Sequence, residues 1–319
     1  MGKDKKRFHH VYGPVPSRRL GRSLGVDLVP FKVCTYDCIY CQLGKTTEKT
    51  ALRRPYVPVE PLMDELQRAL DRGARPDYIT LSGSGEPTLH SELGRIMTAV
   101  RKMTDTPLAV ITNGSLLWDE DVRMSLRKAD LLVPSLDGGN GTLFRRINRP
   151  CREITFPKMI DGLFRMRDEY AGPFWLEVFL VAGLNDGEKA LGDLKSLIDR
   201  MGPDRVQLNT NVRSPARKAA PPVDAEKMKA IARSFGDPWE VVTALEASSG
   251  VEPSLSRERE AAILEMIERR PSTAEDVASG LGLAVNEVIK LLDGTALRGS
   301  VETFQSGEEI YYTRKRRHQ

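Results

Sequence analysis

Short apolar runs alternate with longer amphipathic segments between residues 24 and 245. The runs are rich in β-branched and aromatic residues, and each is followed by a loop with Gly, Pro, Asn or Asp, which is typical of buried strands. The expected strands are residues 24–29, 78–81, 108–112, 131–135, 175–181 and 205–209. The expected helices include residues 61–71, 91–102, 156–169 and 186–200, with Pro61 in a first turn, where its missing N–H has no partner to lose.

This alternation of strands and helices predicts an α/β fold with a parallel sheet and right-handed crossovers. The six repeats fit an incomplete (β/α) barrel or an open doubly wound sheet. In both architectures the active site lies at the carboxyl ends of the strands. We therefore expect functional residues in the loops that directly follow the strands.

The pattern changes after residues 244–256, a stretch with Ser, Gly and Pro that predicts a linker. Residues 257–269, 273–280 and 284–297 have helical periodicity, and residues 300–312 predict a hairpin around Ser306 and Gly307. Three helices with a tight second turn and a hairpin indicate a C-terminal winged helix-turn-helix. The expected domains are residues 1–250 and 251–319.

The charge of the C-terminal segment argues against DNA binding. Residues 254–319 carry ten Lys and Arg against eleven Asp and Glu, whereas phosphate neutralisation supplies much of the affinity for nucleic acid. On the third helix we expect Asn286, Glu287, Lys290 and Asp293 to be exposed. A module for protein contact, dimerisation or substrate presentation is favoured, with nucleic-acid binding as the alternative.

The overall composition, with 40% apolar and 29% charged residues, is that of an ordinary globular protein. No apolar run approaches the roughly 18 residues that span a bilayer, and no apolar stretch follows the basic start of the chain, so we expect no membrane and a cytoplasmic location.

The net charge is only +4. Basic residues gather in 1–22 and 314–317, which indicates either solvated ends or a phosphate-bearing partner.

Three of the four cysteines, Cys34, Cys38 and Cys41, lie within eight residues in the spacing C-x3-C-x2-C. So few cysteines do not make a disulfide scaffold, and thiolates suit iron–sulfur clusters and zinc alike. Structural zinc requires four ligands, whereas three leave one iron of a four-iron cluster open to a small chelating molecule. Asp37 could be a further ligand or could orient the loop, and Cys151 is either a fourth thiolate or a buried cysteine.

This spacing, with the aromatic Tyr40 before the last cysteine, resembles the signature of the radical S-adenosylmethionine (SAM) superfamily. The resemblance implies an oxidoreductase enzyme with a partial (β/α)6 TIM-like barrel and a metal-binding [4Fe–4S] cluster whose open iron binds the methionine part of SAM. An electron from a donor such as flavodoxin or ferredoxin then cleaves SAM, and the 5′-deoxyadenosyl radical abstracts a substrate hydrogen.

The segment of residues 82–88 lies where the family carries a Gly-Gly-Glu-like motif for the SAM ammonium group. Glycines let the main chain approach a ligand, and a carboxylate offsets the positive amine. Without the cysteine loop, the segment would be an ordinary turn into a helix, and the later strand ends could be ordinary caps. The resemblance implies SAM contacts from Tyr40, Gly83, Ser84, Gly85, Glu86, Asn113, Ser135, Asp137, Leu208 and Asn209.

Residues 13–25 and 42–44 also resemble a subgroup related to the wyosine-type tRNA-modifying radical SAM proteins. The resemblance covers roughly residues 10–215, and no downstream cysteine cluster indicates an auxiliary cluster. Arg145, Arg146 and Arg149 could bind the SAM carboxylate or a phosphate, or form a solvated helix face.

Three functions compete. The first is radical SAM chemistry on an unknown substrate. The favoured substrate is tRNA or another RNA, because both ends of the chain are basic. The second is modification or activation of a protein partner. The third is a cluster-containing DNA-binding regulator, which would have no use for the glycine-rich and strand-end loops.

Overall fold

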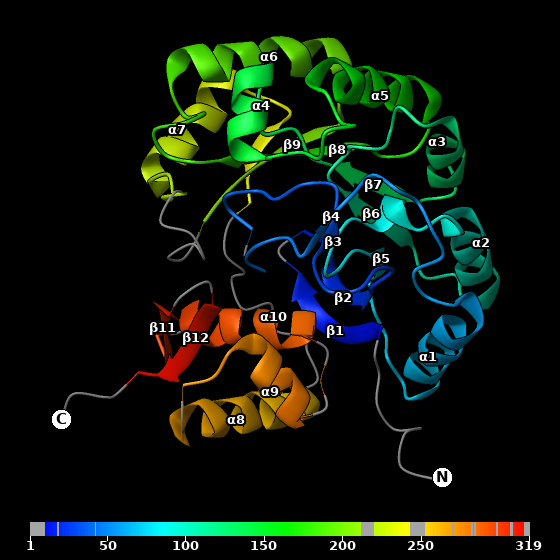
Figure 1. Ribbon diagram of the computed structural model, residues 1–319, viewed down its shortest axis with the longest axis vertical. Helices are drawn as coiled ribbons and strands as arrows, with labels where there is room; N and C mark the ends of the chain where they lie inside the picture. Colours follow the sequence, from blue (N-terminus) through cyan, green and yellow to red (C-terminus); the bar gives the residue numbers. More distant parts are fainter. Residues whose placement is uncertain are drawn as a thin grey trace.

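A curved sheet of mostly parallel strands forms the centre of the larger part of the molecule (Figure 1). The computed structural model describes residues 10–17, 19–41, 43–211, 220–242, 253–269, 271–281, 283, 285–297, 299–306 and 309–315. Neighbouring strands run in the order β1 (Val11–Ser17), β2 (Gly21–Val26), β5 (Tyr78–Leu81), β6 (Leu108–Thr112) and β7 (Leu131–Pro134). A second sheet has β8 (Trp175–Leu180) next to β9 (Arg205–Thr210) and β9 next to β10 (Trp239–Val241).

The two sheets continue one another. Isolated parallel bridges join Leu132 to Phe174 and Ser135 to Glu177, at the border between β7 and β8. All neighbours pair in parallel except β1 and β2. Among the described residues no pairing joins β10 back to β1, which is consistent with a partial barrel and not with a closed one.

Helices cover the outer side of this sheet (Figure 1). They are α1 (Val59–Asp71), α2 (Leu93–Met103), α3 (Glu120–Leu126), α4 (Gly141–Ile147), α5 (Phe156–Glu169), α6 (Glu188–Met201) and α7 (Ala225–Phe235). Alternate strand residues such as Leu24, Val110 and Val178 are buried against the helices in the main core. Their neighbours in sequence face the inner side of the sheet, which carries a small apolar cluster around Ala109 and Val133 as well as polar side chains such as Glu177.

Most predicted strands match the structure, and the differences lie at the edges: β10 was not predicted, and the N-terminal strands differ. β2 begins three residues before the predicted 24–29, because its polar residues pair with neighbours: Ser23 lies opposite Val15 on β1 and Tyr78 on β5. β1 itself was not predicted, since Pro14 interrupts the strand pattern. An edge strand tolerates proline, and the register of β1 shifts between Tyr12 and Val15.

The C-terminal part contains three helices and a hairpin. These are α8 (Pro253–Arg269), α9 (Ala274–Leu281), α10 (Val285–Leu297), β11 (Val301–Ser306) and β12 (Glu309–Arg314). They enclose a second apolar core that includes Ile263, Val277, Val288 and Leu292. Of the predicted linker, residues 244–252 lie outside the described residues, and residues 253–256 belong to α8 instead. Of the predicted turn, Ser306 ends β11 and residue 307 lies outside the described residues.

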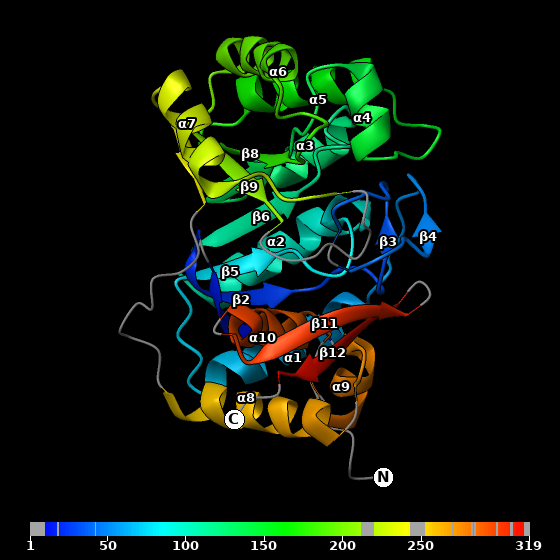
Figure 2. The same ribbon diagram turned by 90° about the vertical axis from the view of Figure 1, so that its left-hand side faces the viewer.

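α10 packs on β1 of the larger part (Figure 2), and its first turn contacts Asp27 after β2 and Ser84 after β5. Asn286 and Glu287 are buried, so the expectation that they face solvent was wrong. The physical reason is that both find partners: Asn286 donates to Asp27 of the larger part, and Glu287 is paired with Arg259 of α8. A polar residue can be buried when its hydrogen-bonding groups are satisfied.

Three short elements complete the larger part. β3 (Val33–Cys34) pairs in parallel with β4 (Glu48–Lys49), and the 3-10 helix η2 (Pro87–Leu89) follows β5. Within the described residues, no helix has the length and apolar character needed to cross a membrane.

Candidate functional site

The cysteine loop begins at the end of β3 and is fixed on both sides by main-chain hydrogen bonds. On one side the Glu86 N–H donates to the carbonyl of Val33, at 3.2 Å. On the other the Asp37 N–H donates to the carbonyl of Asn148, at 3.0 Å, just after α4. The loop that carries Cys34 is therefore held between the end of β5 and the end of α4.

Each of the three clustered sulfurs has a nitrogen donor beside it. The separations are 3.0 Å from Lys32 Nζ to Cys41 Sγ, 3.6 Å from Asn113 Nδ2 to Cys34 Sγ, and 3.5 Å from Asn148 Nδ2 to Cys38 Sγ. None of these cysteines forms a disulfide. Such donors stabilise a sulfur that carries negative charge.

The donor set fits a cluster better than a single ion. Burial, with Glu86 adding to it, raises the pKa of the Cys34 thiol to about 12, and burial also raises the pKa of Cys38 well above its ordinary value. Iron charge offsets this cost when thiolates bind metal. In the described part of the chain, no three His, Cys, Asp or Glu side chains gather around one ion. In a [4Fe–4S] cluster each thiolate binds its own iron, so such convergence is not needed.

The glycines of the Ser82–Thr88 loop permit close main-chain contacts. A Cβ on Gly85 would lie 1.8 Å from the carbonyl oxygen of Val33, and one on Gly83 would lie 2.4 Å from the carboxyl carbon of Asp27. The Lys32 N–H also donates to the Ser84 carbonyl, at 2.8 Å. The glycine-rich loop is thus pressed against the cysteine loop, and only residues without a side chain fit there.

Glu86 connects the ends of two neighbouring strands. One carboxylate oxygen accepts from the hydroxyls of Thr88 and Thr112, each at 2.6 Å, and the other accepts from the Asn113 N–H, at 2.8 Å. Burial raises the pKa of this carboxyl, while the hydrogen bonds act in the opposite direction. Because Asn113 also reaches Cys34, the carboxylate indirectly positions a donor to the cysteine loop.

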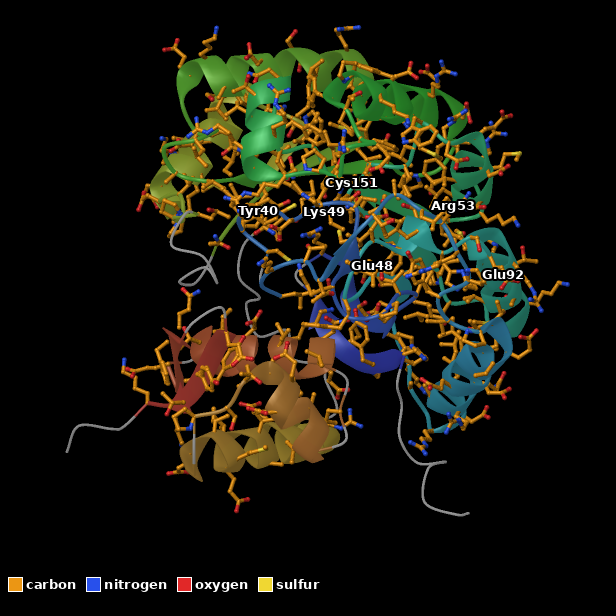
Figure 3. All side chains as sticks on the ribbon, in the orientation of Figure 1. Tyr40, Glu48, Lys49, Arg53, Glu92 and Cys151 are labelled. Atoms are coloured by element: carbon orange, nitrogen blue, oxygen red, sulfur yellow. The ribbon has the colours of Figure 1, made fainter. Side chains whose placement is uncertain are left out.

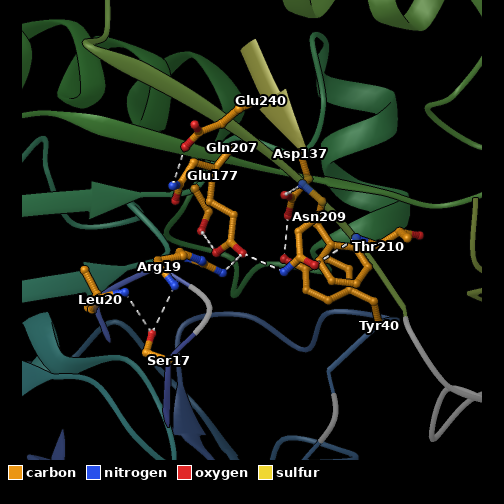
Figure 4. Close-up of polar contacts among 12 residues, drawn as sticks. Ser17, Arg19, Leu20, Tyr40, Asp137, Glu177, Gln207, Asn209, Thr210 and Glu240 are labelled. Atoms are coloured by element: carbon orange, nitrogen blue, oxygen red, sulfur yellow. Dashed lines mark hydrogen bonds and ion pairs between the residues drawn. The ribbon is translucent and has the colours of Figure 1, made fainter. Parts of the chain in front are cut away.

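Asp137 plays a similar part at the end of β7. It accepts from the Tyr40 hydroxyl and from the Asn148 amide, each at 2.6 Å, and from the Phe179 N–H, at 2.9 Å. The Tyr40 ring stacks on Phe179 with centroids 3.8 Å apart, and burial raises the pKa of Asp137 to about 6. Figure 4 shows Tyr40 beside Asp137, so the aromatic residue of the cysteine motif is locked in one orientation.

A third polar group lies on the inner side of β8 and β9. Glu177 forms an ion pair with Arg19, and it accepts from Asn209 Nδ2 at 3.0 Å and from the Ser135 hydroxyl at 3.5 Å (Figure 4). Leu208 lies on the opposite face of β9, fully buried in the main core. Its side chain therefore faces the helices, and at this strand end it is Asn209 that points inward.

The remaining sequence-predicted residues lie apart from these groups. Arg145, Arg146 and Arg149 are exposed on and just after α4, as on a solvated helix face. Cys151 is buried in the main core (Figure 3), and its N–H donates to the Thr35 carbonyl at 2.9 Å. The side chain of Asp37 accepts from the Thr46 N–H at 2.9 Å, which orients the loop.

Sequence reasoning missed several polar residues of the site. Glu177 could have been found, because a charge in the middle of an apolar strand needs a partner. Arg19 stood out only as part of a basic segment. Lys32 and Asn148 carried no signal, since their placement depends on loop conformation; Lys32 has a positive φ of 59°.

Comparisons with known proteins agree with this geometry. The sequence model of the radical SAM superfamily matches residues 28–194. The chain is 38% identical over 94% of its length to a "GTPase Obg" of Brachyspira hyodysenteriae, of which it spans only 44%. It is 34% identical to a UPF0026 protein of Methanocaldococcus jannaschii over 71% of each chain.

Two solved structures share the fold. A radical SAM methyltransferase from Sphaerobacter thermophilus is 18% identical, with a TM-score of 0.50 over 69% of this chain and 65% of that one. The enzyme anSMEcpe, crystallised with AdoMet and the Cp18Cys peptide, is 16% identical, with a TM-score of 0.51 over 67% of this chain and 58% of that one. At such identities the likeness concerns the fold alone.

Proposed function

The chain belongs to the radical SAM superfamily of iron–sulfur enzymes, and we propose that it cleaves SAM reductively at a [4Fe–4S] cluster held by Cys34, Cys38 and Cys41. The observation that carries the proposal is that each of the three sulfurs has its own nitrogen donor. When bound, the two cofactors supply a 5′-deoxyadenosyl radical for hydrogen abstraction from the substrate.

The chain's own residues bind and orient the cofactors. Asn113, Asn148 and Lys32 hold the three sulfurs in place through their hydrogen bonds, as outer residues around a metal centre do. The cysteine loop is only partly buried, and it limits the access of water to reactive species. A reducing partner such as flavodoxin or ferredoxin provides the electron.

SAM binds across the strand ends in this proposal. The main chain of Gly83, Ser84 and Gly85 and the negative charge of Glu86 would hold the SAM ammonium group. The other residues that would hold SAM are Tyr40, Asn113, Ser135, Asp137, Leu208 through its main chain, and Asn209. Because Glu86 and Asp137 already accept several internal hydrogen bonds, they act on SAM mainly through charge and through the loops that they position.

The test is anaerobic reconstitution of the full chain, reduction with dithionite, and chromatographic detection of 5′-deoxyadenosine from SAM. We expect Cys38→Ala to abolish both the cluster absorbance and the product. Cys151→Ala, at a cysteine of the main core, is the matched control and is expected to keep both. A fully loaded wild-type cluster that yields no 5′-deoxyadenosine would refute the proposal.

For the substrate we propose tRNA or another RNA, as in the wyosine-type enzymes, because both ends of the chain are basic. Nucleoside mass spectrometry of RNA from cells with and without the gene tests this proposal. Unchanged nucleosides would refute an RNA substrate, and a protein substrate would remain as the alternative. We propose that residues 1–250 form the catalytic domain, that residues 251–319 form a winged-helix domain, and that the enzyme is cytoplasmic.

The structure of α10 disfavours the competing DNA-binding regulator. In a helix-turn-helix the N-terminal residues of the recognition helix contact base edges. Here Asn286 and Glu287, in the first turn of α10, are buried against the larger part of the chain. Sequence-selective duplex binding without SAM would favour the regulator.

A further inference from the structure

Two basic side chains from distant parts of the chain, Arg19 and Lys290, lie on the inner side of the sheet and repel each other electrostatically. Arg19 comes from the turn before β2 and reaches across the inner side of the sheet to Glu177 on β8. Lys290 comes from α10, and its ammonium lies 5.2 Å from the centroid of the Tyr12 ring of β1. The charge of Arg19, together with burial as the larger cause, lowers the pKa of Lys290 to about 8.

Both side chains hold donors without an acceptor. The Nη1 atom of Arg19 is buried and has no hydrogen-bond partner, although Nη2 is paired with Glu177. In the part of the chain that the structure describes, no carboxylate or carbonyl accepts from the Lys290 ammonium. The unsatisfied buried donor of Arg19 and the repulsion between the two positive charges both cost free energy, and an anion bound by both side chains would remove both costs.

The position of Lys290 is fixed by the helix that carries it. Asn286, one turn earlier on the same face of α10, donates to the carboxylate of Asp27 and to the hydroxyl of Ser84, each at 3.0 Å. Ser84 belongs to the glycine-rich loop assigned to SAM. The C-terminal module thus contacts that loop and, from the same face, presents a cation to the inner side of the sheet.

We infer that Arg19 and Lys290 form a subsite for an anionic group of the substrate, a carboxylate or a phosphate, so that the C-terminal module completes the substrate pocket. This inference rests on the proposed function, because it assigns the inner side of the sheet to the substrate. Glu177 holds the guanidinium in place, and its pairing with only one nitrogen leaves the other for the anion.

The experiment measures the binding of inorganic phosphate, and separately of acetate, to the cluster-loaded full chain by isothermal titration calorimetry at pH 7. We expect Arg19→Gln and Lys290→Met each to weaken the binding of the preferred anion about tenfold or more, as befits the loss of a charged hydrogen bond. Lys290→Arg, which keeps the charge, should restore most of the affinity. The preferred anion then identifies which of the two groups the substrate carries.

The matched control is Lys102→Met, which removes an exposed lysine at the end of α2 and should leave anion binding unchanged. Unfolding curves without anion show whether each variant is folded, and Arg19 and Lys290 test the subsite from two separate parts of the chain. Anion affinity that is unchanged in both variants would overturn the inference. So would loss of anion binding at saturating SAM, because the subsite would then serve the SAM carboxylate.

The two proposals can fail separately. A chain that forms no 5′-deoxyadenosine but binds the anion through Arg19 and Lys290 would refute the proposed function and leave an anion site of another kind. A chain that cleaves SAM but binds neither anion at these residues would refute only the inference.

Discussion

Gly85 offers the sharpest test of how the two loops of the site fit together. In Gly85→Ala the new Cβ would lie 1.8 Å from the carbonyl oxygen of Val33, whereas ordinary contact begins near 3.4 Å. The main chain would have to move by the difference, about 1.6 Å. Val33 immediately precedes Cys34, so the movement would be transmitted to a proposed cluster ligand.

The expected cost follows from two effects. Overpacking of a well-packed region costs about 1–3 kcal/mol. The hydrogen bond from the Glu86 N–H to the Val33 carbonyl, 3.2 Å long, would also be broken, at about 1 kcal/mol. We therefore expect Gly85→Ala to lower the free energy of unfolding by about 2–4 kcal/mol.

The assay is denaturant unfolding of the metal-free chain, together with the iron content and absorbance of the reconstituted chain. Gly192→Ala is the control, because a Cβ there meets no atom within 4 Å and the residue lies inside α6. It should stabilise the chain by about 0.5–1 kcal/mol. If Gly85→Ala unfolded at the wild-type midpoint and bound a full cluster, the proposed close packing of the two loops would be wrong.

Two further predictions concern buried charges. Burial raises the pKa of Asp27 from 3.8 to about 6, so the folded state binds a proton at this carboxyl more tightly than the unfolded state does. The protonated carboxyl therefore adds to the free energy of unfolding at low pH. This contribution is fully present below the unfolded pKa of 3.8 and is lost as the pH rises through about 6. The difference in unfolding free energy between wild type and Asp27→Asn should therefore fall by about 2 kcal/mol from pH 4 to pH 7 in denaturant titrations, and a constant difference would contradict this. Lys32→Met removes the ammonium that lies 3.0 Å from Cys41 Sγ, and the reduction potential of the cluster should fall by roughly 60 mV or more, at 59 mV per tenfold change in the one-electron equilibrium. A redox titration followed by electron paramagnetic resonance measures it, and the exposed Lys49→Met on the same segment should leave the potential unchanged.

The fold was largely predictable where local pattern and tertiary position agree. β5 and β6 match their predicted residues because each is a short apolar run that pairs on both sides. The three clustered cysteines could be singled out because their spacing is local. β1 was not predicted because it contains a proline, which is tolerated only in the edge strand of a sheet. A single sequence does not tell which strand lies at the edge.

The polar interior of the site was less predictable, since it depends on contacts between distant residues. Arg19 and Glu177 are 158 positions apart, and nothing local pairs them. Asn286 and Glu287 have the polarity of exposed residues, and their burial follows only from the packing of α10 on β1 and on the loops after β2 and β5. Leu208 was expected to face the cofactor, yet the alternation of β9 turns its side chain to the helices.

The carboxylate of Glu86 has a consequence for the evolution of the family. Threonine hydroxyls from two separate elements, η2 and the end of β6, converge on it at positions 88 and 112. If a homologue replaced Glu86, both threonine hydroxyls would lose their hydrogen-bond acceptor. If it lost one threonine, the Glu86 carboxylate would lose a hydrogen-bond donor. Substitutions at positions 86, 88 and 112 should therefore be inherited as a set among homologues.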